Sequence, residues 1–158
     1  KVHGRASHAG LDPEKGVNAT VEMSYIIQQI VALENKEFGT TVVPTTLHSG
    51  TVTNTVPALA VLDIDSRSFT MAELERIDQS IKNLKSKHPE VRLEVTGGIN
   101  RPPLELHSTQ NLYATLEKVA ASIGMKAIGS ASVGGASDGN LAAATGVEVL
   151  DGLGAVGD

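Results

Sequence analysis

The sequence predicts a mixed α/β (α+β) fold in which two helices cover an antiparallel sheet, followed by an incomplete α/β segment. Two stretches repeat apolar residues at three- and four-residue spacing, which indicates amphipathic helices. The stretches around them are rich in β-branched residues or alternate apolar and polar side chains, which indicates strands. After Pro102-Pro103 the composition shifts toward glycine and alanine, and we expect a boundary there between two parts of the chain.

The first long element is predicted to be a helix, preceded by a short extended stretch at residues 1–6. Asp12-Pro13 is a helix-start signal, because proline is tolerated in the first turn. The apolar side chains that follow form the expected buried face: Ala19, Met23, Ile26, Ile30 and Leu33. Extended chain is expected next, at residues 40–46 and 51–53, on either side of a turn at residues 48–50.

A strand, a helix and a last strand are predicted to follow. Residues 58–67 form the strand, and its inward side chains are Ala60, Leu62 and Ile64. Residues 70–73 have a capping-box sequence that opens a helix with the apolar face Leu74, Ile77, Ile81 and Leu84. Residues 91–95 alternate as the last strand. The resulting order, β-α-β-β-α-β, is that of the ferredoxin-like arrangement, an antiparallel sheet with both helices on one face.

The sequence divides into residues 1–103, the ferredoxin-like domain, and residues 104–158, a partial second domain. The second part is predicted to contain a helix with the apolar residues Leu112, Leu116, Val119 and Ile123. Short strands near residues 126–129 and 147–150 and a small helix near 141–144 are also expected. So short a segment cannot close a parallel sheet with both faces covered. We therefore expect the chain to be an internal piece of a longer protein.

Composition excludes several classes of function. The formal net charge is −5 and the basic residues are scattered, so we expect no nucleic-acid partner, which would need a concentrated positive surface. The chain has no cysteine, which excludes disulfides, thiolate zinc sites and cysteine nucleophiles and is typical of a cytoplasmic location. No apolar run approaches membrane-spanning length, so we expect no membrane partner.

Two local patterns do not carry the chemistry that they suggest. The segment Gly135-Ala136-Ser137-Asp138-Gly139 matches the nucleophile elbow G-x-S-x-G, but all five histidines precede it, whereas the catalytic histidine follows the serine in that fold. A helix start with Ser137 or Asp138 as N-cap explains the same residues. No metal-binding spacing of histidines and carboxylates is present, so we expect no metal ligands in this chain.

Five motifs, in order along the whole chain, resemble a known family. They are Gly4-Arg5-Ala6-Ser7-His8-Ala9-Gly10 with Pro13 and Gly16-Val17-Asn18-Ala19; Thr53-Asn54-Thr55-Val56-Pro57; Leu62-Asp63-Ile64-Asp65-Ser66-Arg67; Gly134-Gly135-Ala136-Ser137-Asp138-Gly139-Asn140; and Leu150-Asp151-Gly152-Leu153-Gly154. The sequence resembles the glutamate carboxypeptidase, acetylornithine deacetylase and succinyl-diaminopimelate desuccinylase family of zinc peptidases. Residues 1–103 look like its dimerisation domain, or lid, and residues 104–158 like part of its catalytic domain.

The resemblance implies a homodimeric enzyme in which a dinuclear zinc domain hydrolyses an amide bond next to a free carboxylate. In the family the zinc ligands and general base precede the lid, and a final histidine follows the last motif. This chain would therefore supply dimerisation and substrate-binding residues but no ligand for the zinc cofactor, and it is expected to be inactive alone. The last motif looks most like glutamate carboxypeptidases, which favours a small N-acyl amino acid or peptide as substrate.

The resemblance also implies roles for five residues, each with a simpler alternative. His8 would reach the neighbouring subunit's active site and donate to the carbonyl oxygen, or it is a solvated loop residue. Asn54 would lie near that oxygen or the substrate carboxylate, or it forms an Asx-turn. Arg67 would clamp the substrate carboxylate, or it pairs with a neighbouring aspartate. Gly135 and Ser137 would line the substrate site, or they only begin a helix.

A function of another class fits residues 1–103 as well. A stand-alone ferredoxin-like dimerisation or ligand-sensing module would have the same fold without catalysis. Residues 104–158 distinguish the two hypotheses, because a simple sensor has no reason to carry them.

Overall fold

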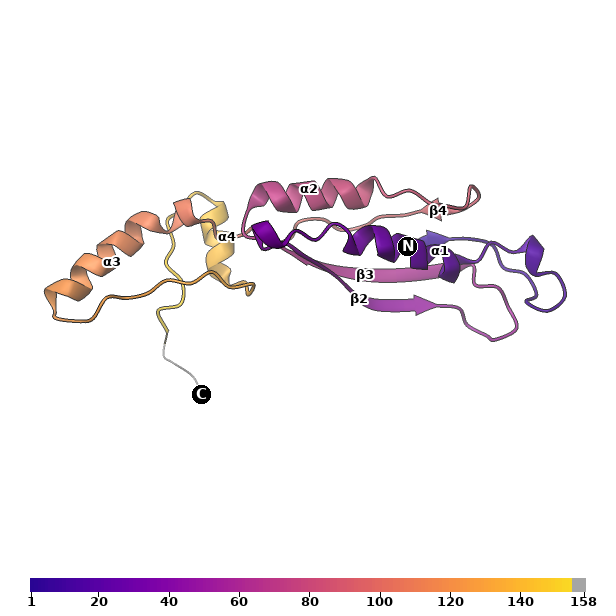
Figure 1. Cartoon of the computed structure of the whole chain (residues 1–158), viewed down its shortest axis with the longest axis horizontal. Helices are drawn as coiled ribbons and strands as arrows, with labels where there is room; N and C mark the ends of the chain where they lie inside the picture. Colours follow the sequence, from indigo (N-terminus) through magenta and orange to yellow (C-terminus); the bar gives the residue numbers. More distant parts are fainter. Residues whose placement is uncertain (155–158) are drawn as a thin grey trace.

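The computed structural model describes residues 1–154; the last four residues of the predicted segment 104–158 lie outside the described residues. The main elements are β1 (Val2–His3), α1 (Ala19–Val31), β2 (Thr41–Ser49), β3 (Leu59–Arg67), α2 (Met71–Lys82), β4 (Arg92–Leu93), α3 (Gln110–Ser122) and α4 (Asp138–Ala144). Short 3₁₀ helices lie at Pro13–Lys15 (η1), Lys36–Phe38 (η2) and Leu106–Ser108 (η3). The molecule is elongated, with α3 and α4 beyond the end of the sheet (Figure 1).

The four strands form one antiparallel sheet in the order β2-β3-β1-β4, which confirms the predicted ferredoxin-like topology. Thr41 pairs with Arg67 at one end of β2, and Ser49 pairs with Ala60 at the other. The register shifts between Pro44 and Thr46. The two edges of the sheet differ, because β2 has nine residues and β4 has two.

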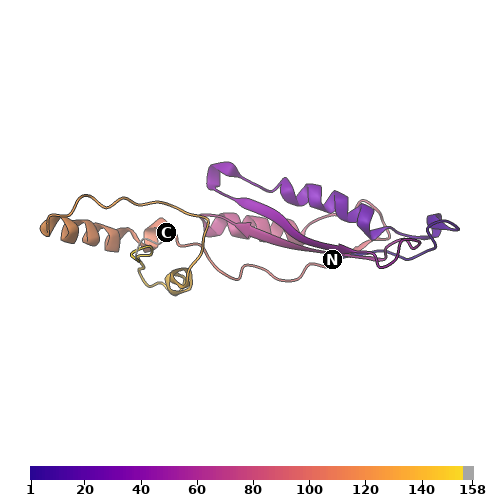
Figure 2. The ribbon, with the colours of Figure 1, turned by 90° about the horizontal axis from the view of Figure 1, so that it is seen from below.

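Both helices pack against the same face of the sheet, as predicted. Figure 2 shows the sheet and α1 from a second side. One buried cluster joins the two helices and the sheet through Val2, Val17, Ala19, Met23, Ile26, Ile30, Val42, Ala60, Ile77 and Val91. Leu33, Leu62, Ile64, Ile81 and Leu84 are partly buried against it. The predicted apolar faces of both helices are therefore confirmed, since their members either belong to this core or pack beside it; Leu74 is also buried.

The predicted boundaries are wrong in three places. The helix does not follow Pro13 directly, because the Asn18 side chain accepts hydrogen bonds from the backbone N–H groups of Thr20 and Val21 and starts α1 there. The predicted turn at residues 48–50 is also wrong, since β2 continues through Ser49. Residues 51–53 are turn rather than extended chain, because β3 offers them no partner.

The capping box of α2 is half formed. The Thr70 hydroxyl accepts the Glu73 N–H at 3.4 Å, as expected. The Glu73 carboxylate does not return to the cap but accepts from the Arg76 guanidinium and, at 2.9 Å, from the hydroxyl of buried Thr40. These charge-assisted bonds hold the pKa of Glu73 below its ordinary value, with the bond from Arg76 as the main cause. The same carboxylate thus ties α2 to the start of β2.

A buried carboxylate fixes the connection between α2 and β4. Glu22 on α1 is 3% exposed, and its two oxygens accept the backbone N–H groups of Lys87 at 2.5 Å and His88 at 3.1 Å. The ammonium of Lys87 lies over the Tyr25 ring, 4.1 Å from its centroid. This connection is therefore anchored on α1 although it has no regular secondary structure over residues 84–91.

The last strand is shorter than the predicted 91–95, because regular pairing covers Arg92–Leu93 only. Beside it the Glu94 carboxylate accepts from the Lys1 ammonium at 2.8 Å and contacts the His3 imidazole at 2.9 Å. These two contacts lower the pKa of Glu94 to about 2, and the hydrogen bond from Lys1 has the larger effect. Residues 1 and 94 are also joined by a backbone hydrogen bond, from the Glu94 N–H to the Lys1 carbonyl.

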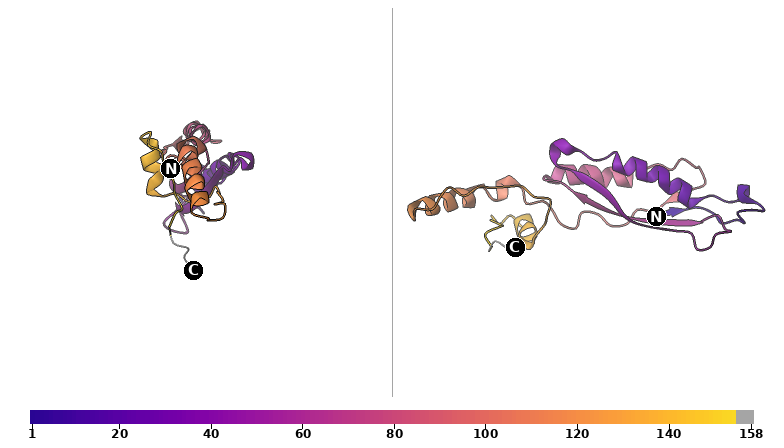
Figure 3. Two further views of the ribbon diagram at one scale, coloured as in Figure 1. Left: turned by 90° about the vertical axis from the view of Figure 1, so that its left-hand side faces the viewer. Right: turned by 60° about the horizontal axis from the view of Figure 1, so that its bottom comes forward.

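The second part of the chain contains the two predicted helices but not the predicted strands. Residues 126–129 and 147–150 are irregular, because the described chain offers no strand beside them. The right-hand view of Figure 3 shows the tail beyond the end of the sheet. Several of its apolar side chains face solvent: Leu106, Val119, Ile123, Met125, Val133, Val147 and Leu153. Within residues 1–154 no helix has both the length and the apolar character needed to cross a bilayer.

Candidate functional site

The loop that carries His8 is held by backbone pairing on both sides. Arg5 and Val17 exchange two backbone hydrogen bonds of 3.0 and 2.8 Å, and the Gly4 N–H donates to the Ala58 carbonyl at 2.8 Å. Gly4 has to be glycine, because a Cβ there would lie 2.0 Å from the Val17 carbonyl oxygen. The loop thus leaves the sheet in a defined direction.

His8 lies at the surface with its imidazole oriented by its own loop. Its Nδ1 accepts hydrogen bonds from the backbone N–H groups of Gly10 and Leu11, both at 3.1 Å. Its carbonyl accepts the Asp12 N–H at 3.1 Å, which closes the turn. The ring is therefore fixed on one side and open to solvent on the other.

Asn54 lies beside His8, although the two are far apart in the sequence. The Ala9 N–H donates to the Asn54 carbonyl at 2.8 Å, and His8 forms an isolated antiparallel bridge with Thr55. The Val56 N–H donates to the Ser7 carbonyl at 2.9 Å and continues this ladder. The side chain of Asn54 is exposed, and its Oδ1 accepts only a long bond, 3.5 Å, from the Thr55 hydroxyl.

A tightly packed glycine supports this loop and was not singled out by the sequence analysis. A Cβ at Gly16 would lie 2.4 Å from the Ser7 hydroxyl oxygen and 2.9 Å from a Val56 methyl carbon. That hydroxyl is buried and has no hydrogen-bond partner among the described residues. Gly16 belongs to the first of the five motifs. Its packing role could not be predicted, because it depends on contacts with Ser7 and Val56, which are not its neighbours in the sequence.

Arg67 lies at the other end of the sheet and makes two contacts. Its guanidinium binds both carboxylate oxygens of Asp65, at 2.8 and 3.1 Å, which is the simpler alternative that the sequence offered. Its Nη1 also donates to the Gly134 carbonyl at 2.8 Å, which joins β3 to the tail. The Arg67 guanidinium lowers the pKa of Asp65, and Asp65 raises the pKa of Arg67, because each stabilises the other's charged form.

The turn next to Arg67 is organised around Ser137. Its hydroxyl donates to the Asp151 carboxylate at 2.6 Å and accepts the Gly139 N–H at 3.0 Å, and it forms a full capping box with Asn140. The sequence predicted Ser137 or Asp138 as the N-cap of this helix, and the structure has Ser137. The bond from Ser137, and then the N–H of Gly152, lower the pKa of Asp151. The partnership of Ser137 with Asp151 was not predicted, although both residues stand in quoted motifs.

Gly135 has no packing reason to be glycine within the described chain. A Cβ there would meet nothing within 4 Å, and the residue is exposed.

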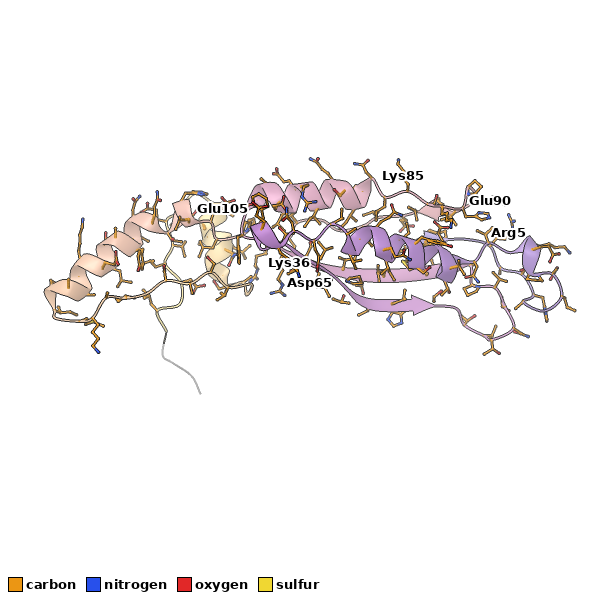
Figure 4. The ribbon with its side chains drawn as sticks, viewed as in Figure 1. Arg5, Lys36, Asp65, Lys85, Glu90 and Glu105 are labelled. Atoms are coloured by element: carbon orange, nitrogen blue, oxygen red, sulfur yellow. The ribbon has the colours of Figure 1, made fainter. Side chains whose placement is uncertain are left out.

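The structure therefore forms two pairs but does not bring them together. His8 lies with Asn54, and Arg67 lies with the Gly134 turn, at opposite ends of β3. Figure 4 labels Arg5, on the His8 loop, near one end of the sheet and Asp65 toward the other. β3 runs from Leu59 to Arg67, so at about 3.4 Å per residue its ends are about 27 Å apart.

The described residues do not fit a zinc centre. No group of three or more histidine, aspartate or glutamate side chains within residues 1–154 is arranged to hold a metal ion. Two carboxylates in contact with candidate residues, Asp65 and Asp151, are bound to Arg67 and Ser137.

Similar proteins extend over the whole chain. Carboxypeptidase G2 of Pseudomonas sp. (strain RS-16) is 30% identical over 166 residues, covering 99% of this chain and 38% of that protein. A tripeptidase from Staphylococcus aureus has a similar structure, with a TM-score of 0.68 and 21% identity over 93% of this chain and 39% of its own. Aminopeptidase PepT from Bacillus cereus has a TM-score of 0.68 and 23% identity over 92% of this chain and 39% of its own.

These likenesses agree with the topology of the sheet and with the fold predicted from the sequence. At such low identity the two solved structures show the fold alone. The chain spans less than two fifths of the length of each of these relatives. The family model of the peptidase dimerisation domain matches residues 1–92. More than half of the chain is thus accounted for, and the chain belongs to the M20 peptidase dimerisation-domain family.

Proposed function

We propose that this chain is the dimerising lid and part of the catalytic domain of a zinc-dependent peptidase or amidohydrolase that cleaves an amide bond next to a free carboxylate. The family match and the similarity to carboxypeptidase G2 support a hydrolase. That similarity covers 99% of the chain, the tail included, which favours the enzyme over a stand-alone dimerisation or sensing module. The proposed substrate is a small N-acyl amino acid or peptide, and the proposed location is the cytoplasm.

The separation of the two residue pairs carries the proposal. A small substrate cannot touch both ends of β3, which are about 27 Å apart. If His8 and Arg67 serve the same substrate molecule, they must therefore come from two different subunits. The site is then complete only in a dimer.

The register of the sheet supports one way of assembling such a site. β2 is a free edge, and two copies of an edge strand can pair antiparallel about a two-fold axis. Pairing over the whole strand would bring the Ser49 end of one β2 to the Thr41 end of its partner. Because Thr41 is the register partner of Arg67, the His8 loop of one subunit would then face the Arg67 end of the other.

Each candidate residue then has a role that suits its chemistry. His8 donates a hydrogen bond to the carbonyl oxygen as it gains charge, with Asn54 beside it. Arg67 binds the free carboxylate of the substrate through its planar fork, exchanging one of its contacts with Asp65. Gly135 and Ser137 shape the turn on which Arg67 rests. Because the described residues do not fit a metal centre, we assign no step through zinc to them.

A mixed-dimer experiment on the full-length protein tests this assignment. His8→Ala is expected to lower the rate about a hundred- to thousandfold, because an oxyanion donor is lost. A second variant lacks one zinc ligand, identified in the remainder of the protein, and is inactive for a different reason. After subunit exchange half of the dimers are mixed and one site in each is intact, so roughly a quarter of the wild-type rate is expected to return.

Two controls make the outcome interpretable. Subunit exchange is verified by mixing differently tagged copies. His88→Ala, which changes an exposed histidine in the connection between α2 and β4, away from β2, is expected to keep full activity. If exchange is complete and no activity returns, His8 does not act across the dimer and the proposal is wrong.

A further inference from the structure

We propose that the backbone N–H groups of Gly10 and Leu11 are positioning groups that select, for the neutral imidazole of His8, the tautomer with its single proton on Nε2. This inference rests on the proposed function, since it explains how His8 would be ready to donate a hydrogen bond. It concerns residues of this chain alone and requires no metal or substrate.

The tautomer follows from the chemistry of the two partners. A backbone N–H can only donate, and both N–H groups lie 3.1 Å from Nδ1. Nδ1 must therefore present its lone pair, and a proton there would face two other N–H groups. A neutral imidazole has one N–H, so the proton is on Nε2. Among the described residues no hydrogen bond reaches that Nε2, which leaves it free to donate.

The loop is shaped to present these two donors. η1 begins only at Pro13, so the N–H groups of Gly10 and Leu11 are not used by a helix. The Leu11 side chain is 80% exposed, so this residue contributes its N–H rather than packing. A Cβ at Gly10 would approach the His8 ring no closer than 3.7 Å, an ordinary contact. The backbone, not the side chains, therefore sets the state of the ring.

Other histidines of the chain provide internal references. His48 is exposed, and no hydrogen bond to its ring is found in the described part of the chain. His88 is intermediate, because its Nδ1 accepts one backbone N–H, from Glu90 at 3.2 Å. If backbone donors set the tautomer, the fraction of the neutral ring that has its proton on Nε2 should decrease in the order His8, His88, His48.

Nitrogen NMR of the ¹⁵N-labelled chain at neutral pH tests the inference. We expect His8 to show one protonated and one unprotonated ring nitrogen and a through-hydrogen-bond coupling from its Nδ1 to the amides of Gly10 and Leu11. His48 should show shifts averaged between tautomers. Leu11→Pro removes one donor, and we expect its coupling to vanish and the His8 shifts to move toward those of His48. Leu11→Ala keeps the N–H and should leave the spectrum unchanged.

A second variant distinguishes the loss of the N–H in Leu11→Pro from a change in the conformation of the loop. Replacing the Leu11 amide by an ester removes the same N–H without a ring, and the bond from the Ala9 N–H to the Asn54 carbonyl reports whether the loop is intact. Averaged His8 shifts in the wild type, or unchanged shifts in both variants with an intact loop, would overturn the inference.

Activity of the full-length protein separates this inference from the proposed function. Leu11→Pro should lower kcat with little change in KM, and it should have no further effect once His8 is alanine. A fixed tautomer by NMR together with full activity of His8→Ala would leave the positioning intact and refute the catalytic role of His8.

Discussion

Replacing Glu22 by glutamine tests whether one buried carboxylate anchors the connection between α2 and β4. Glu22 is 3% exposed, and each of its oxygens accepts one backbone N–H, from Lys87 or from His88. Glutamine has nearly the same size and shape but only one acceptor oxygen. Its NH₂ group would face a backbone N–H, so the N–H of Lys87 or of His88 would lose its acceptor.

The expected cost follows from the bonds that are lost. A hydrogen bond to a charged group contributes about 1.5–3 kcal/mol, and a buried N–H left without an acceptor costs a similar amount. The two energies describe the loss of the same hydrogen bond and are therefore not added. We expect Glu22→Gln to lower the free energy of unfolding by about 3 kcal/mol. With a slope of about 2 kcal/mol per molar urea, the unfolding midpoint should fall by about 1.5 M.

Urea unfolding followed by circular dichroism measures this change. Glu75→Gln is the matched control, because Glu75 lies in the first half of α2 with an exposed side chain, and we expect it to stay within about 0.5 kcal/mol of wild type. A Glu22→Gln midpoint as close to wild type as that of the control would show that the carboxylate is not needed to hold the connection.

Two further predictions concern the first strand. The Lys1 ammonium holds the pKa of Glu94 at about 2, below the ordinary 4.5, so the stabilisation is present above pH 4.5 and is lost as the pH falls through about 2. Glu94→Gln should therefore reduce the loss of stability over that range, measured as urea midpoints against pH; an unchanged profile would contradict this. Gly4→Ala should cost about 3 kcal/mol, because its Cβ would lie 2.0 Å from the Val17 carbonyl oxygen. Gly98→Ala, whose Cβ meets nothing closer than 3.6 Å, should be neutral, and equal midpoints for the two variants would count against the steric argument.

The spacing of apolar residues predicted the helices and strands that bury one face against the core. The spacing of Met23, Ile26 and Ile30 located α1, because helical periodicity directly reports which side chains meet the core. The same reasoning failed at residues 51–53, which have β-branched side chains but no strand beside them. Strand formation depends on a partner that the local sequence does not contain, and for the same reason residues 147–150 are irregular in this chain.

The sequence predicted which residues belong to the candidate site but not how they are arranged in space. The resemblance pointed to His8 and Asn54, yet their adjacency comes from a ladder between segments about 46 positions apart. A pairing of Arg67 with a neighbouring aspartate, Asp65 or Asp63, was foreseen, and the partner is Asp65, two residues away on the same face of the strand. The bond from Arg67 to Gly134 was not foreseen, since it spans 67 positions and depends on where the tail lies.

The unequal edges of the sheet limit how far strands can add to it. β4 has two residues, too few to serve as a template, whereas β2 has nine. Proline at position 44 removes one backbone N–H from β2, so the strand has fewer donors for a neighbouring strand. Among residues 1–154, β2 is the one long edge of the sheet, so the sheet can accept one neighbour there and then has no comparable edge left. Pairing of two β2 strands would therefore be self-terminating and would not continue into open-ended fibres.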